Sequence, residues 1–262
     1  SLKDFYLCDT GDSRSRGLAS LYELGRINEI YERITACSDI DSENLKIAAF
    51  SSFISEIEQK DAGHNFCKNP LAFLYKSKID GPDSLITELI VELKQLKTVW
   101  EPYNKSTRKG FQSRINLFEN PTGKISNLKK IILEKLEDYY LKFKNEKCSF
   151  IAKWPSAKNL VGWHVILKQQ GHQTPHIHSG GWLSGVIYLK VVPALGKNEG
   201  AIEFSLNGRH YFHPKSPAEV HQPEVGDMIL FPSSLHHRTI PFTTDAERII
   251  VSFDLLPSNH TT

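Results

Sequence analysis

Histidine side chains are concentrated in one part of this chain. Nine of its eleven histidines lie between residues 164 and 237, and two of them, His176 and His178, follow Pro175. Residues i and i+2 of an extended strand point to the same face, so these two imidazoles could hold one metal ion from one side. A third histidine from a distant strand would complete a three-point site and leave coordination positions open for chemistry.

A second pair, His236 and His237, follows an apolar run at residues 228–231 that ends in Pro232-Ser233-Ser234. Adjacent residues on a strand point to opposite faces, so at most one of this pair is expected to join the metal. Periodicity alone does not say which one.

Two further residues could bind an anion or simply belong to the core. Arg248 begins an apolar run, so its guanidinium is expected in a partly buried setting, where it needs an anion such as a carboxylate. An internal salt bridge with a nearby acid (Asp245, Glu247 or Asp254) would serve equally well. Tyr188 lies midway along another apolar run, where an aromatic ring is by default a core residue with one hydroxyl to satisfy.

The elements that must position these residues change in kind near residue 145. Before that point, apolar residues recur at helical spacing in residues 13–36, in a run to Ile57 with a cap at 41–44, in 82–98 and in 125–143. Residues 103–120 are polar and contain a glycine, and residues 105–110 within them predict a loop. Residues 18–26 weakly resemble a tetratricopeptide helix, but one copy is not a repeat array.

After residue 145, short runs rich in β-branched and aromatic residues alternate with turn residues, which predicts antiparallel strands. The expected strands are 148–154, 160–169, 182–192, 201–206, 227–231 and 248–255. The fold class is therefore α+β, with a helical region at 1–145 and a β domain at 146–262.

Composition limits the class of protein. The chain has 262 residues, 40% hydrophobic and 24% charged, with a net charge of +2, which gives no case for nucleic acid or a membrane as partner. No apolar run approaches the roughly 20 residues that span a bilayer. The four cysteines (Cys8, Cys37, Cys67 and Cys148) are far apart, which predicts reduced thiols and a cytoplasmic location. A start at Ser1 suggests an excised fragment or a tag remnant.

The motifs of the β region together resemble the iron(II)- and 2-oxoglutarate-dependent oxygenases, in particular bacterial and phage members of that superfamily and, more distantly, prolyl hydroxylases. The resemblance covers about residues 145–256 and is most specific in residues 230–241 together with Arg248. It implies a double-stranded β-helix, or jelly-roll, with iron(II), 2-oxoglutarate and O₂ as reactants.

Carried over residue by residue, the resemblance implies that His176 and His237 ligate iron and that Tyr188 and Arg248 bind the distal carboxylate of 2-oxoglutarate. Three residues on the strand before the motif could face cosubstrate or substrate, namely Trp163, Lys168 and Gln170. The activity implied is hydroxylation of an unactivated C–H bond.

His178 stands where most of the superfamily has Asp or Glu, and three interpretations follow. His178 could ligate iron in a three-histidine site, which we favour. It could instead act from outside the coordination sphere, or a distant carboxylate such as Glu203 could take its place. Three neutral imidazoles would leave the metal one formal charge more positive.

The sequence leaves the substrate open among a protein residue, an amino acid and a small metabolite. A homodimer through the helical region is a further option. Two other classes of function fit the same residues. One is a cupin-like three-histidine dioxygenase or isomerase that does not use 2-oxoglutarate, and the other is a non-catalytic metal-binding or partner-binding module.

Overall fold

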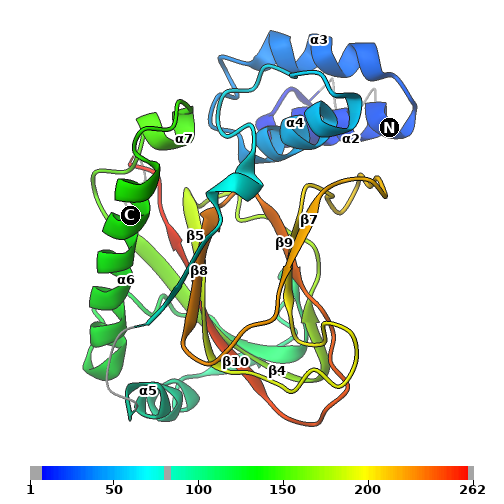
Figure 1. The fold of residues 1–262 in the computed structure, drawn as a ribbon. Helices are drawn as coiled ribbons and strands as arrows, with labels where there is room; N and C mark the ends of the chain where they lie inside the picture. Colours follow the sequence, from blue (N-terminus) through cyan, green and yellow to red (C-terminus); the bar gives the residue numbers. More distant parts are fainter. Residues whose placement is uncertain (1–7, 80–83, 259–262) are drawn as a thin grey trace.

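The N-terminal part of the chain is a unit of three helices above one end of the β-strands (Figure 1). The computed structural model describes residues 8–79 and 84–258, and the unit consists of α2 (Gly11–Glu23), α3 (Ile27–Cys37) and α4 (Leu45–Glu58). The helical stripe expected at 13–36 is thus two helices. Gly25 divides them with a φ of 70°, and the Arg26 N–H donates to the Leu21 carbonyl, which closes a Schellman turn.

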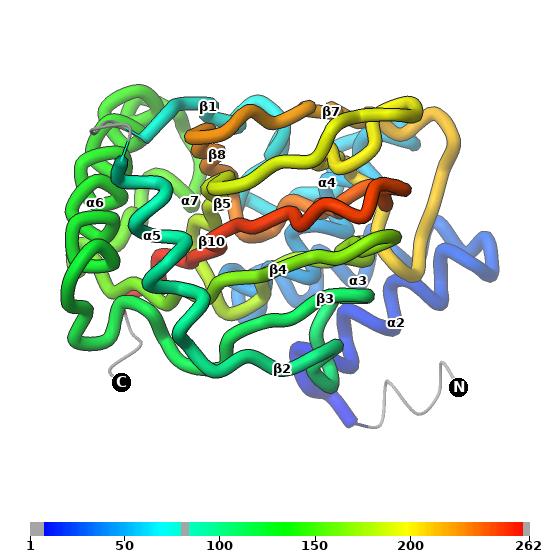
Figure 2. Tube along the Cα trace, turned by 90° about the horizontal axis from the view of Figure 1, so that it is seen from below, coloured from blue at the N-terminus to red at the C-terminus, as the bar shows by residue number. Residues whose placement is uncertain are grey.

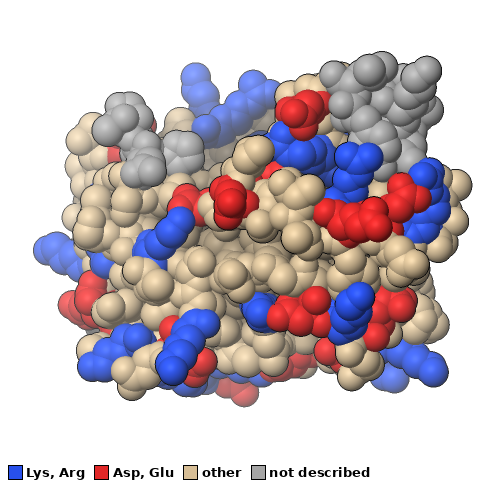
Figure 3. Space-filling model, turned by 90° about the horizontal axis from the view of Figure 1, so that it is seen from above, with Lys and Arg blue, Asp and Glu red and all other residues tan. Residues whose placement is uncertain are grey.

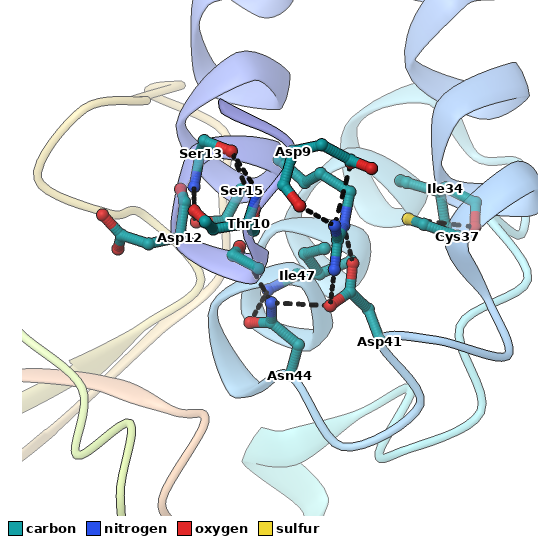
Figure 4. A network of polar contacts seen from close by, with 12 residues as sticks. Asp9, Thr10, Asp12, Ser13, Ser15, Ile34, Cys37, Asp41, Asn44 and Ile47 are labelled. Carbon is teal, nitrogen blue, oxygen red and sulfur yellow. Dashed lines mark hydrogen bonds and ion pairs between the residues drawn. The ribbon is translucent and has the colours of Figure 1, made fainter. Parts of the chain in front are cut away.

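A polar network holds this helical unit together (Figure 4). Arg14 donates hydrogen bonds to both carboxylate oxygens of Asp41, with N···O distances of 2.5 and 2.9 Å. Asn44 caps α4 by accepting from the backbone N–H groups of Lys46 and Ile47, which confirms the cap expected at 41–44. The Asn44 amide also donates to the Gly11 carbonyl and so ties α4 to the start of α2.

Three more helices and one 3₁₀ turn lie against the strands. They are α5 (Ser84–Lys94), α6 (Gly123–Phe143), α7 (Ser149–Ala152) and η1 (Pro70–Phe73). Helices α5 and α6 lie beside one end of the larger sheet (Figure 2). The strand expected at 148–154 was wrong, because those residues form α7. A short apolar run has too few residues for its periodicity to separate a buried strand from a buried helical turn. Pro82 and Asp83, expected to open α5, lie outside the described residues.

The β domain consists of two antiparallel sheets that face each other across a core (Figure 1). The larger sheet has seven strands in the order β1-β8-β5-β10-β4-β3-β2, and the smaller has the order β7-β6-β9. The strands are β1 (Tyr75–Lys78), β2 (Thr98–Trp100), β3 (Thr107–Ser113), β4 (Leu160–Gln173), β5 (Leu183–Lys190), β6 (Ile202–Ser205), β7 (Ala218–His221), β8 (Asp227–Pro232), β9 (His236–Thr239) and β10 (Arg248–Leu255). This arrangement confirms the expected α+β fold with helices first and a jelly-roll-like sheet pair after them.

Three strands of the larger sheet come from before residue 145, so the sheet extends past the expected domain boundary. One of them, β3, begins within residues 105–110, which were expected to form a loop. It pairs with β4 at close range, since a Cβ on Gly110 would lie 2.8 Å from the Ile166 carbonyl oxygen. Glycine is therefore required there, and a single glycine amid polar residues masks a strand in the sequence pattern.

Alternation along the central strands divides the larger sheet into two faces. Ile166, Val251 and Phe253 pack in one core cluster with the helices α5 and α6. Val165, Ile250 and Tyr188 belong to a second cluster, which fills the space between the two sheets and extends to α2 and α4. Side chains of this second parity therefore line the interior of the jelly-roll.

On the face of the molecule shown in Figure 3, basic and acidic side chains are interspersed. That face offers no extended basic surface of the kind that binds nucleic-acid phosphates. Within residues 8–79 and 84–258, no helix combines the length and apolarity that a bilayer crossing requires.

Replacing His164 with leucine is expected to make stability less sensitive to acid. This histidine lies fully buried on β4, neither ring nitrogen has a hydrogen-bond partner in the described part of the chain, and burial lowers its pKa to about 4. Unfolding restores an ordinary pKa near 6.5, so the unfolded state takes up a proton first, and stability falls as pH drops below 6.5. Between pH 7.5 and 5 this group accounts for a loss of about 2 kcal/mol.

Urea unfolding of the metal-free protein at the two pH values measures this loss. His210→Leu is the matched control because His210 is exposed. An equal pH dependence in wild type and His164→Leu would show that His164 does not carry this effect.

Candidate metal and anion site

Three histidine rings meet at the seam between the two sheets. His176 and His178 lie on the segment after β4, and His237 lies on β9. The backbones of His176 and His237 join in an antiparallel bridge, with two N–H···O bonds of 3.1 Å. One ring nitrogen from each of the three histidines lies within 4.8 Å of the others. This bridge explains how residues about 60 positions apart reach one point.

Hydrogen bonds to the Nδ1 atoms set the orientation of all three rings. Nδ1 of His176 lies 2.7 Å from the Thr174 carbonyl oxygen, and Nδ1 of His237 lies 3.1 Å from that of Leu235. Nδ1 of His178 lies 2.6 Å from Oδ1 of Asp254. Since these partners accept, each Nδ1 carries the proton and each Nε2 keeps its lone pair.

The Nε2 atoms of His176 and His178 converge. Nε2 of His176 and Nε2 of His178 are 3.3 Å apart, although two lone pairs facing each other at that distance repel. A cation between them removes the repulsion, and neutral imidazole is the form that ligates metal. Burial lowers the pKa of His176 to about 3 and that of His237 well below its ordinary value, so both rings are neutral at physiological pH. The donor set therefore fits a divalent metal ion.

The other histidine of the second pair points elsewhere. The ring of His236 packs edge-on against Tyr211, with 5.6 Å between centroids, whereas the ring of His237 lies 4.7 Å from Phe231 in the interior. Glu203, considered as a replacement ligand, instead pairs with Arg238 through two contacts of 2.8 Å. No carboxylate joins the three-histidine cluster among the described residues.

Arg248 and Tyr188 form a second polar feature on the interior face of the larger sheet. The guanidinium carbon of Arg248 lies 5.0 Å from the centre of the Tyr188 ring, and both side chains are fully buried. Nε of Arg248 donates to the Gly200 carbonyl, but neither Nη1 nor the Tyr188 hydroxyl has a hydrogen-bond partner within residues 8–79 and 84–258. Burial accordingly lowers the pKa of Arg248 and raises that of Tyr188.

The internal salt bridge that could have explained Arg248 is not formed in the described part of the chain. Glu247 pairs with Lys94 and Lys168, and Asp254 pairs with His178. A buried guanidinium beside an unsatisfied hydroxyl lacks an anionic acceptor, and a carboxylate with two oxygens would satisfy both groups. This is the property expected of a subsite for a carboxylate ligand.

Lys168 and Gln170, predicted to face cosubstrate or substrate, do not lie with these groups. Lys168 lies on the face of β4 that points away from the interior, and its Nζ lies 2.5 Å from Oε1 of Glu247. Gln170 is exposed at a position with a φ of 63°. Trp163 has the interior parity, and its ring centroid lies 5.4 Å from that of His178.

Three residues of the site were not recognised as such from the sequence. Ser106 places its Oγ 3.2 Å from Nε2 of His176, while Asp254 and Ser184 contact Nδ1 of His178. The alternation of β10 already puts Asp254 on the same face as Arg248. Its partner comes from a segment 76 residues away, which no local pattern connects to it.

Comparisons with known proteins agree with this geometry. Residues 162–254 match a family model described as "Putative 2OG-Fe(II) oxygenase". This part of the chain is thus similar to the 2-oxoglutarate- and iron(II)-dependent oxygenases, which confirms the resemblance seen in the sequence. The match supports an enzyme of the oxidoreductase type, and iron and 2-oxoglutarate are the cofactors that the family's description names. No curated protein sequence matches the chain.

Solved structures share the fold at low sequence identity. A prolyl hydroxylase from Trichoplax adhaerens, in complex with a hypoxia inducible factor peptide fragment, is 12% identical with a TM-score of 0.51, covering 82% of this chain and 90% of its own. The carbocyclase SnoK from nogalamycin biosynthesis is 12% identical with a TM-score of 0.50, covering 72% and 83%. A Pseudomonas putida prolyl-4-hydroxylase is 13% identical with a TM-score of 0.49, covering 72% and 96%.

Proposed function

We propose that this protein is an iron(II)- and 2-oxoglutarate-dependent dioxygenase that hydroxylates an unactivated C–H bond. The observation that carries the proposal is the pairing of two unsatisfied features in one β domain. Ring nitrogens of three histidines converge on one point, and the buried Nη1 of Arg248 and hydroxyl of Tyr188 have no hydrogen-bond partner among the described residues. A metal ion and a dicarboxylate together would satisfy both.

In this proposal His176, His178 and His237 hold the metal through Nε2. Their Nδ1–H groups donate to the Thr174 carbonyl, the Asp254 carboxylate and the Leu235 carbonyl, so no ring has to change tautomer when the metal binds. The site is therefore preorganised, which lowers the cost of assembling it.

Arg248 and Tyr188 would hold the distal carboxylate of 2-oxoglutarate. The guanidinium supplies a fixed positive charge and the hydroxyl a directed hydrogen bond, both in a setting from which water is excluded. In this proposal the keto acid end of the cosubstrate would be the part that reaches the metal.

Iron(II), when bound, supplies the oxygen chemistry, in which O₂ and 2-oxoglutarate give succinate and CO₂ while one oxygen atom enters the substrate C–H bond. The substrate itself stays open among a protein residue, an amino acid and a small metabolite. Trp163, beside His178 in the interior, is the aromatic surface that a substrate would meet.

Purified protein is expected to release succinate from 2-oxoglutarate only when iron(II) and O₂ are both present. The first readout is uncoupled turnover, which needs no substrate. Mass spectrometry measures the succinate that is released. Zinc-loaded protein is the control, because zinc has no redox chemistry. Failure to bind any divalent metal would overturn the proposal.

One observation favours a second candidate. The cluster contains no carboxylate, as in a three-histidine dioxygenase whose substrate binds the metal directly, without 2-oxoglutarate. Iron-dependent consumption of O₂ that does not respond to 2-oxoglutarate would decide for this second function.

A further inference from the structure

Asp254 is a buried acid that directly contacts one of the three clustered histidines. Its Oδ1 accepts a hydrogen bond of 2.6 Å from Nδ1 of His178 and another of 2.7 Å from Oγ of Ser184. The Ser184 hydroxyl also lies 2.8 Å from Oγ of Ser233, so the carboxylate belongs to a small polar network in the wall of the jelly-roll.

The fold places this carboxylate with little freedom. Asp254 sits near the end of β10 opposite Ser184 of β5, on the interior face of the sheet. The chain passes it so closely that a Cβ on Gly181 would lie 3.0 Å from Cγ of Asp254 and 2.7 Å from Oγ of Ser233. Only a residue without a side chain leaves room for the contact with His178.

His178 differs from the other two histidines in the charge of its partner. Nδ1 of His176 and Nδ1 of His237 face neutral backbone carbonyls, whereas Nδ1 of His178 faces a carboxylate. A carboxylate on the far nitrogen fixes the ring and makes the near nitrogen a stronger donor to a metal ion. The Asp254 carboxylate therefore places a negative charge one imidazole away from the proposed metal position.

We propose that Asp254 is a positioning residue for the metal, which acts through His178 and supplies the negative charge that a carboxylate ligand would otherwise provide. This inference rests on the proposed metal site. It assigns to the chain a carboxylate–histidine–metal relay built from β10 and the segment before β5. Three neutral imidazoles would leave a divalent ion with its full charge in a buried site, and Asp254 offsets part of that charge.

The test measures Co(II) affinity by competition with a chromophoric chelator and records the visible absorption of the bound ion. Asp254→Asn keeps an oxygen that can accept from Nδ1 but removes the charge, and it is expected to weaken Co(II) binding by about 10- to 100-fold. Asp254→Ala removes both and should bind more weakly still. The matched control is Asp227→Asn, because Asp227 is also a buried acid that contacts a histidine, His221, at 2.9 Å, outside the cluster.

A second background separates this role from a merely structural one. In His178→Asp the imidazole is absent and a carboxylate can ligate directly, so adding Asp254→Asn is expected to cause no further loss of Co(II) affinity. An equal loss in both backgrounds would mean that Asp254 supports the fold and does not act through His178.

The outcomes distinguish the two proposals. If wild-type protein binds no Co(II), the metal site and this inference both fail. If wild type binds Co(II) and Asp254→Asn binds it equally well, or Asp227→Asn loses as much, only the role of Asp254 is overturned. The specific loss with Asp254→Asn, absent from the His178→Asp background, supports it.

Discussion

Replacing Arg248 with methionine is expected to weaken 2-oxoglutarate binding by about 100-fold or more. Truncating one partner of a buried, hydrogen-bonded charge pair costs about 2–5 kcal/mol, and each 1.4 kcal/mol is a factor of ten in affinity. Arg248 is fully buried, and no described carboxylate pairs with it, so its charge is available for a ligand. Calorimetric titration of the nickel-loaded protein with 2-oxoglutarate measures the change without turnover.

The same substitution is expected to leave the ligand-free protein as stable as wild type, or more stable. A buried guanidinium without a counterion is costly, and methionine fills a similar volume without a charge. Thermal unfolding without ligand should therefore show an unchanged or higher midpoint, while the shift that 2-oxoglutarate causes in wild type should disappear.

Arg238→Met is the control for Arg248→Met. Arg238 lies ten residues earlier, is partly exposed and pairs with Glu203 on the outer side of β9. It should leave the affinity for 2-oxoglutarate unchanged. Wild-type affinity in Arg248→Met would show that the carboxylate subsite lies elsewhere.

Replacing His237 with alanine is expected to lower metal affinity strongly, because it removes one of three direct ligands. Losing a group that only hydrogen-bonds to a ligand costs about 10- to 100-fold in metal affinity, and the loss with His237→Ala should be larger. With two imidazoles left, the metal would be held from one segment only. Equilibrium dialysis with iron(II) under nitrogen, followed by metal analysis, gives the occupancy. Succinate release should fall in parallel.

The neighbouring residue provides the control for this loss. His236 is also buried, but its ring faces Tyr211, so His236→Ala should keep metal binding. Loss of metal in His236→Ala but not in His237→Ala would reverse the assignment of the β9 ligand. His178→Ala measured beside them tests the third ligand, and unchanged metal affinity there would place His178 outside the coordination sphere.

Local sequence patterns were sufficient for much of the β domain. The run that begins at Arg248 is β10 over its whole length, and the expected α6 differs from the observed helix by two residues at its start. These segments are long and strongly periodic, so burial and propensity agree in them. The expectation failed at α7 and β3, where the runs are short or polar and contacts with distant segments decide the conformation.

The candidate site divides in the same way. Strand alternation required His176 and His178 to share a face, and it allowed only one of His236 and His237 to join them. Alternation puts His236 and His237 on opposite faces of β9 but does not say which face is the interior one. The packing of the opposing sheet decides that. The direction of Lys168 likewise depends on the tertiary structure, because its side chain pairs with Glu247 on the side of β4 that faces away from the interior.

By itself, then, the sequence determined the residue types, their spacing and the alternation that puts Arg248 and Asp254 on one face of β10. Only the tertiary structure decided that Arg248 has no acid partner and that Asp254 is held by His178 instead. The physical reason is that a charged side chain is satisfied by whatever group lies within about 3 Å of it. The contact between β10 and a segment 76 residues earlier is created by the closing of the two sheets.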